Sequence, residues 1–140
     1  MEHSLHNKVS IVHSTAPAVY TASTVGAEID TKGFESCEFI IHIGTALVGG
    51  GFTALLEDSP DNGSGAPTGV WTAVADENRL GALPVSIATD ANLVLRVGSI
   101  SKERFQRLTL TETGTVSAGV IGATCVLGHP KNAPTTEQAT

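Results

Sequence analysis

The sequence predicts an all-β domain: a two-sheet antiparallel sandwich, with a jelly roll as the leading topology and an immunoglobulin-like sandwich as the second. Short runs rich in β-branched residues recur along the chain, and Gly, Pro, Asn and Asp separate them. No stretch combines apolar residues at helical spacing with helix caps. The immunoglobulin alternative ranks second because Cys37 and Cys125, with Trp71 between them, are too far apart for its usual disulfide.

The length of 140 residues fits one domain. We expect a flexible N-terminal arm at 1–8, a single sandwich domain at 9–129 and a flexible C-terminal tail at 130–140, because both ends are polar. Charged residues make up 16% of the chain and hydrophobic residues 41%. This composition excludes a disordered chain or a coiled coil over most of the length.

The first half of the chain contains four candidate strands before its glycine run. Val9–His13 is the first, and Ala16-Pro17-Ala18 interrupts it because proline has no amide hydrogen. Ala18–Ser23 and Gly26–Asp30 follow as short β-branched runs, and Thr31-Lys32-Gly33 forms a turn. Ser36–Ile43 is the clearest strand, because Cys37, Phe39, Ile41 and Ile43 alternate with Glu38, Ile40 and His42.

The second half repeats this pattern after Gly49-Gly50-Gly51, which we expect to break the chain. Phe52–Glu57 precedes a loop at 58–67 that is full of turn residues. The next strands are Val70–Val74, which holds Trp71, then Pro84–Thr89 and the alternating run Asn92–Gly98. Phe105–Thr113 also alternates, Gly114 is expected to turn the chain, and Thr115–Leu127 is expected to be a long final strand.

The charge balance limits the possible partners. A net charge of −6 and a pI of about 5.2 argue against nucleic-acid binding, which depends on neutralising phosphates. No apolar run is long enough for a membrane span. Four basic residues lie close together in sequence: Arg96, Lys102, Arg104 and Arg107. They form either an ordinary solvated face or a small cationic patch that docks on an acidic partner.

The two cysteines have no C-x-x-C spacing, and no apolar signal-peptide core follows Met1. We therefore expect a reducing compartment and two free, buried thiols.

Motifs for catalysis or metal binding are missing. The five histidines form no H-x-H pair, and Asp58–Gly63 lacks the frame and the closing Glu of a calcium loop. Neither a G-x-S-x-G motif nor a phosphate-binding glycine loop is present. We predict no enzyme activity and no cofactor.

Several segments together resemble a known family. These are Ala27–Asp30, Lys32–Phe39, Leu55–Ser59, Gly69–Val74, Val97–Ile100 before Phe105, and Gly122–Pro130. In this order they are similar to the capsid cement (decoration) proteins, small virion proteins of tailed phages that are encoded beside the major capsid gene. The resemblance covers about residues 9–134.

The resemblance implies a jelly-roll protein without an active site or cofactor. Such a protein assembles in the host cytoplasm onto the outer surface of the phage head. There it bridges neighbouring subunits of the major capsid protein, often as a homodimer, and stiffens the shell. We expect the partner interface to include Arg96, Lys102, Arg104 and Arg107, together with His129, Pro130 and Lys131 at the start of the tail. The alternative is a carbohydrate- or receptor-binding sandwich, which an exposed Trp71 beside the 58–67 loop would favour.

Overall fold

Apolar side chains at alternate positions of β4 (Phe34–Ile43) define the inner face of one sheet. The computed structural model describes residues 5–86, 89–132 and 135. Cys37, Phe39, Ile41 and Ile43 are all buried, at 3% exposure or less. Glu38, Ile40 and His42 lie on the opposite, outer face of the same strand, as the sequence pattern predicts.

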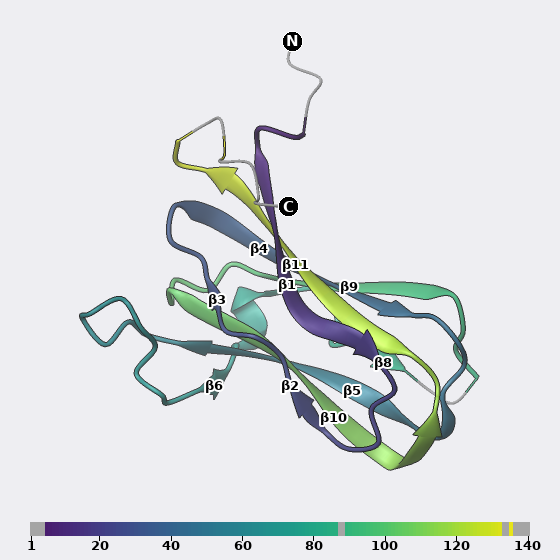
Figure 1. The fold of residues 1–140 in the computed structure, drawn as a ribbon. Helices are drawn as coiled ribbons and strands as arrows, with labels where there is room; N and C mark the ends of the chain where they lie inside the picture. The colour runs from purple at the N-terminus through teal and green to yellow at the C-terminus, as the bar shows by residue number, and fades with distance from the viewer. Residues whose placement is uncertain (1–4, 87–88, 133–134, 136–140) are drawn as a thin grey trace.

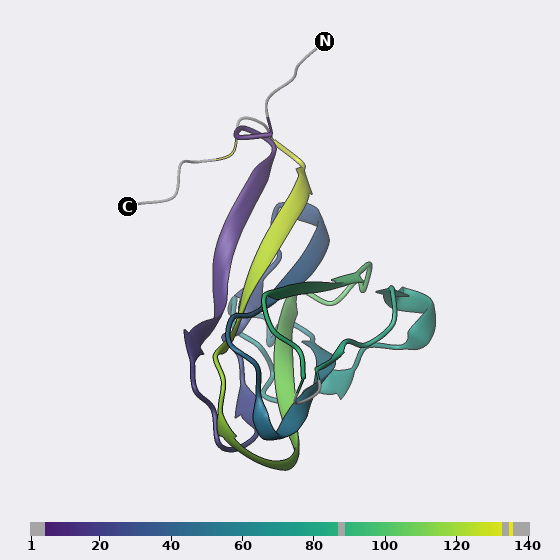
Figure 2. The ribbon, with the colours of Figure 1, turned by 90° about the vertical axis from the view of Figure 1, so that its right-hand side faces the viewer.

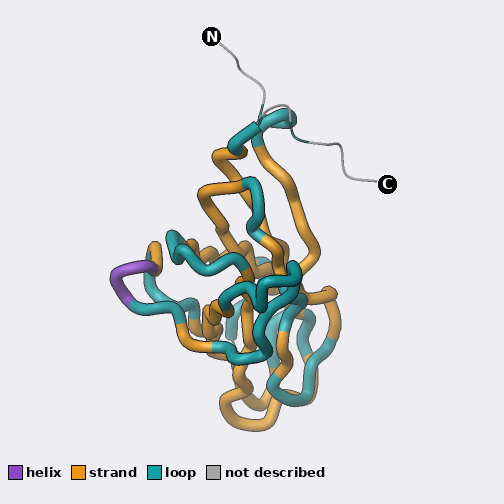
Figure 3. Tube along the Cα trace, turned by 90° about the vertical axis from the view of Figure 1, so that its left-hand side faces the viewer, coloured by secondary structure: helices purple, strands orange, loops and turns teal. Residues whose placement is uncertain are grey.

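The described residues form eleven strands and one 3-10 turn. The long strands are β1 (Val9–Ala18), β4, β5 (Val48–Ser59), β9 (Leu93–Ser99), β10 (Phe105–Ala118) and β11 (Ile121–Pro130). The short ones are β2 (Thr24–Val25), β3 (Ile29–Asp30), β6 (Thr72–Ala73), β7 (Arg79–Leu80) and β8 (Val85–Ser86). The turn η1 covers Asp76–Asn78 and is the purple segment of Figure 3.

Two antiparallel sheets pack face to face and confirm the predicted sandwich (Figure 1). Sheet A has the strand order β1-β11-β4-β9-β7. Sheet B has the order β2-β10-β5-β6, with β3 also paired to β10 and β8 to β5. Figure 2 shows β1 and β11 side by side in sheet A, where their register runs from Val9 opposite Gly128 to Ala18 opposite Ile121.

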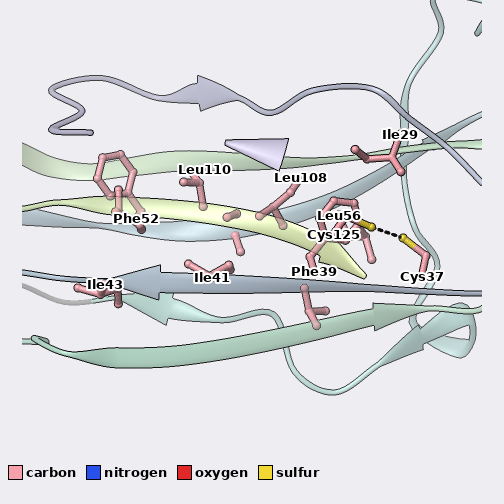
Figure 4. Close-up of a cluster of buried hydrophobic side chains, with 14 of the residues drawn as sticks. Ile29, Cys37, Phe39, Ile41, Ile43, Phe52, Leu56, Leu108, Leu110 and Cys125 are labelled. Carbon is pink, nitrogen blue, oxygen red and sulfur yellow. Dashed lines mark hydrogen bonds between the residues drawn. The ribbon is translucent and has the colours of Figure 1, made fainter. Parts of the chain in front are cut away.

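The core lies between the inner faces of the two sheets (Figure 4). Sheet B contributes Phe52, Ala54, Leu56, Leu108 and Leu110, each 1% exposed or less. Full burial of one phenylalanine or leucine side chain stabilises the fold by roughly 1.5–3 kcal/mol. The alternate residues of each strand therefore form two outer faces, and any binding surface on the strands has to use one of these.

The glycines were expected to interrupt strands, and this expectation is wrong at two places. β5 runs through Gly49-Gly50-Gly51, and β10 continues past Gly114 to Ala118. Gly114 lies opposite Gly50, beside an irregularity in the register. A Cβ on Gly50 would lie 2.3 Å from the carbonyl oxygen of Thr113. These glycines therefore let two backbones approach closely at a bulge, whereas the turn before β11 contains Gly119 with φ +106.

Pro17 was also expected to end the first strand, but β1 extends through it to Ala18. β1 is the edge strand of sheet A, where a missing amide hydrogen is tolerated. A Cβ on Gly122 of β11 would lie 2.9 Å from the Cα of Pro17, so the absence of a side chain at Gly122 leaves room for the proline.

Several other expected strands are shorter than predicted or absent. Ala18–Ser23 is not a separate strand, and Gly26–Asp30 contributes β3 only. Val70–Val74 is reduced to β6, in which Thr72 and Ala73 pair with β5, and the amide of Val74 also donates to the carbonyl of Leu56. Pro84–Thr89 contributes β8, and residues 87–88 lie outside the described residues.

Candidate functional site

The four basic residues predicted to form a patch do not share one surface. Arg96 lies on the outer face of sheet A, where it stands opposite Ile40 of β4. Arg107 lies on sheet B opposite Glu57 of β5. Lys102 is exposed in the connection between β9 and β10, and Arg104 directly precedes β10. Of the two interpretations left open by the sequence, a single patch of all four residues does not form, because Arg96 and Arg107 lie on different sheets and Lys102 and Arg104 lie in the connection between β9 and β10.

Arg104 joins two acidic segments that are distant in sequence. Its Nε and Nη2 donate to the two carboxylate oxygens of Asp30 at 2.8 and 2.7 Å, and its Nη1 donates to Asp61. The guanidinium also stacks 5.0 Å from the centre of the Phe105 ring. The hydrogen bonds from Arg104 hold the pKa of Asp30 below its usual range. This arginine connects β3, the start of β10 and the loop after β5.

Arg107 is part of a second internal network. Its Nε donates to Glu57 at 2.9 Å, and Thr109 donates to the same carboxylate oxygen at 2.6 Å. Burial opposes ionisation of Glu57, but these hydrogen bonds outweigh it and lower its pKa. The guanidinium lies 4.3 Å from the centre of the Trp71 ring. One face of this half-buried tryptophan is therefore covered by Arg107.

These contacts change how the predicted interface can be tested. Reversing the charge of Arg104 or Arg107 would break contacts within the domain as well as any contact with a partner. Arg96 is a better probe: its side chain is 82% exposed, and its Nε lies 3.6 Å from Glu38.

The last three predicted interface residues lie where β11 ends. The ring nitrogen Nδ1 of His129 is 2.9 Å from the hydroxyl of Ser36, and His129 has a positive φ of 51°. Pro130 pairs with Phe34, and the amide of Lys131 donates to Gly33. Pro130 therefore belongs to β11, although the sequence placed it in the tail. Further on, the amide of Thr135 donates to the carbonyl of Asn7 at 3.0 Å, which joins parts of the two predicted flexible segments.

An open groove of about 680 Å³ lies beside β6 and the connection after β9. Its polar lining includes Asp58, Thr72, Asn78, Ser101, Lys102 and Glu103. Asp58 is only 9% exposed and accepts hydrogen bonds from Thr72 at 3.3 Å and from Ser101 at 2.5 Å. The sequence indicated neither the groove nor the buried carboxylate in its wall.

The outer face of sheet A is a second feature that the sequence analysis missed. The register places Ile11 of β1 beside Val126, and Ile40 beside Thr124 and Arg96. Val94 on β9 and Leu80 on β7 extend this apolar surface and are 58% and 49% exposed. Glu38 and Arg96 lie within it as an ion pair. The signal was present in the sequence, since Ile40 interrupts an otherwise polar outer face of Ser36–Ile43.

The outer face of sheet B has a different character. Thr53 of β5 pairs with Thr111 of β10, and Gly51 pairs with Thr113. Thr111 and Thr113 are exposed, and Val25 of β2 stands opposite Thr109. Val85 of β8 stands opposite Thr53, so this face combines threonines with the exposed Val25 and Val85, apart from the Arg107 network at one end.

Among the described residues, no group of three or more His, Cys, Asp or Glu side chains comes together as a metal site. No helix in this part of the chain is long and apolar enough to cross a membrane. The chain matches no protein-family model, no curated protein and no solved structure.

Proposed function

We propose that this protein is a structural binding module whose partner docks on the outer face of sheet A, and that it acts as a capsid cement protein. The observation that supports docking is the group of apolar side chains on this face, where Ile11, Val94 and Leu80 are exposed and Ile40 and Val126 are half-buried. Exposed apolar patches of this kind typically mark contact sites for other proteins. The choice of the major capsid protein as partner rests on the sequence resemblance.

The strand order supports a jelly roll as the finer description of this fold. In a jelly roll, a long hairpin folds back on itself, so that strands pair from the outside inward. Here β1 pairs with β11, β2 and β3 with β10, β4 with β9, and β5 with β6 and β8. The further pairs β11–β4 and β10–β5 join these hairpin segments into two sheets.

An exposed sheet face suits a protein that bridges neighbouring subunits. The apolar residues would provide most of the contact free energy, at roughly 25 cal/mol for each Å² removed from water. The Glu38–Arg96 pair would fix orientation more than affinity. In this proposal the protein is located on the outer surface of the virion, and the free protein pairs with a second copy, which sedimentation velocity would detect.

Co-sedimentation with phage heads that lack their small proteins tests the proposal. We expect saturable binding at a fixed ratio to the major capsid protein. Val94→Glu should weaken binding at least tenfold, because it places a charge in the apolar face of sheet A. Val25→Glu is the matched control: its valine is 56% exposed and lies on sheet B. No binding by the unmodified protein would reject the cement function. Equal effects of both variants would reject the outer face of sheet A as the docking surface.

A carbohydrate-binding function is the second candidate, and the groove beside Asp58 favours it. Carboxylate, hydroxyl and amide groups line this groove, as in sites that recognise sugar hydroxyls. The coverage of Trp71 by Arg107 removes one ring face from sugar stacking and so counts against it. Two results together would support this candidate. The protein would bind to a glycan array and lose this binding in the Asp58→Asn variant, and it would not bind to phage heads.

A further inference from the structure

The two cysteines meet in the core although they are 88 positions apart in sequence. Cys37 lies on β4 and Cys125 on β11, the neighbouring strand of sheet A, and their sulfur atoms are 3.1 Å apart (Figure 4). Cys37 is 3% exposed and Cys125 is fully buried. Both side chains point inward from diagonal positions, since Cys125 stands opposite Phe39 and Cys37 opposite Leu127.

A bond between these atoms requires a shift of the backbone as well as of the side chains, because Cα atoms at diagonal positions of an antiparallel pair lie about 7–8 Å apart and a disulfide usually spans about 4.4–6.8 Å. A disulfide has a sulfur–sulfur distance of about 2.05 Å, so the two atoms need to approach by roughly 1 Å. The antiparallel ladder continues on both sides of the pair, from Ile121 opposite Ile43 to Gly128 opposite Ser36. The two strands therefore have to adjust locally at the cysteines, while the pairing on either side holds them together.

We propose that Cys37 and Cys125 are a disulfide-forming pair that cross-links β4 and β11 when the protein meets an oxidised small-molecule disulfide such as glutathione disulfide. One cysteine thiolate attacks the small disulfide, forms a mixed disulfide and releases one thiol. The second cysteine then attacks the protein sulfur of the mixed disulfide and releases the second thiol. In total, two protein thiols are oxidised to a disulfide, and the small disulfide is reduced to two thiols.

The surroundings of the pair determine how fast this exchange occurs. The hydrogen bond with Cys125, together with burial, raises the pKa of the Cys37 thiol, so the reactive thiolate is scarce in the closed fold. The oxidant also has to reach sulfur atoms inside the sandwich. Exchange therefore depends on transient separation of β4 and β11, or occurs before the core closes during folding. Once formed, the bond is protected from reductants by the same burial.

The test uses the full chain and glutathione disulfide, with and without urea below the unfolding midpoint. Remaining thiols are alkylated with N-ethylmaleimide in denaturant and the intact mass is measured. We expect N-ethylmaleimide to modify neither cysteine after oxidation. The mass should then be two hydrogens below that of the reduced, unmodified chain. Oxidation should be faster in urea, and the melting temperature should rise on the order of 10 °C, because the cross-link restricts the unfolded chain. After trypsin, the peptides Gly33–Arg79 and Leu108–Lys131 should be joined.

The proposal is overturned if the folded protein still alkylates at both cysteines after exhaustive oxidation, or if it accumulates glutathione adducts or disulfide-linked dimers. Cys37→Ala and Cys125→Ala are the matched controls. Each folded variant should form at most one glutathione adduct and show no rise in melting temperature from a cross-link. If either variant fails to fold, the mass and peptide measurements on the unmodified chain still decide the question.

Discussion

At the scale of single residues, Glu57 links the stability of the sandwich to pH. Its side chain is 14% exposed and is held by Arg107 and Thr109. Its pKa is lower in the folded protein than in the unfolded chain, where the pKa of a glutamate is about 4.3. The stabilisation is therefore present above that pH and disappears as the pH falls through the lower, folded pKa.

We expect Glu57→Gln to lower the free energy of unfolding at pH 7 by roughly 1 kcal/mol. When the pH is lowered below about 4, the variant should lose less further stability than the unmodified protein. Urea titrations at several pH values measure both effects. Glu77→Gln, in the exposed η1 turn, is the control and should leave the curve unchanged. If the Glu57→Gln variant and the unmodified protein showed parallel acid profiles, Glu57 would not be the group responsible.

At the scale of elements, the contact between β5 and β10 depends on glycine. Gly50→Ala should destabilise the fold by roughly 1–3 kcal/mol, because the new methyl group would meet the backbone carbonyl of Thr113. Gly44→Ala is the matched control, since its Cβ would lie 3.7 Å from the Val120 side chain, an ordinary contact. Urea unfolding compares the two variants, and similar losses would mean that close approach of the strands is not what Gly50 provides.

The same elements show what the sequence could and could not predict. The alternation in 37–43 identified β4 and its buried face, because a period of two is a local property of the chain. The glycines were misinterpreted because a glycine that ends a strand and one that admits a neighbouring backbone look identical in sequence. The Arg104 contacts with Asp30 and Asp61 span 74 and 43 positions, so they depend on strand register that no local pattern supplies. For this reason the basic residues were assigned to a partner interface although the domain uses most of them internally.

At the scale of the whole molecule, the pairing of early with late strands predicts slow folding. β1 has to find β11 from the opposite end of the sequence, and loop closure has to precede these contacts. We expect refolding to take milliseconds to seconds. Stopped-flow fluorescence of Trp71 after dilution from urea measures this rate. A double-jump experiment separates this phase from proline isomerisation. A main phase in microseconds would contradict the prediction.

The antiparallel pairing of β1 with β11 also determines how the molecule responds to mechanical load. The start of β1 and the end of β11 are neighbours, with Val9 opposite Gly128. A force that pulls these two points apart acts across the strands and opens the ladder one hydrogen bond at a time, as in a zipper. A load applied along the strands would have to shear many hydrogen bonds at once. In the proposed cement role, the protein would therefore be a weak connector if it were tensioned through these two strand ends, and a strong one if the tension ran along the strands.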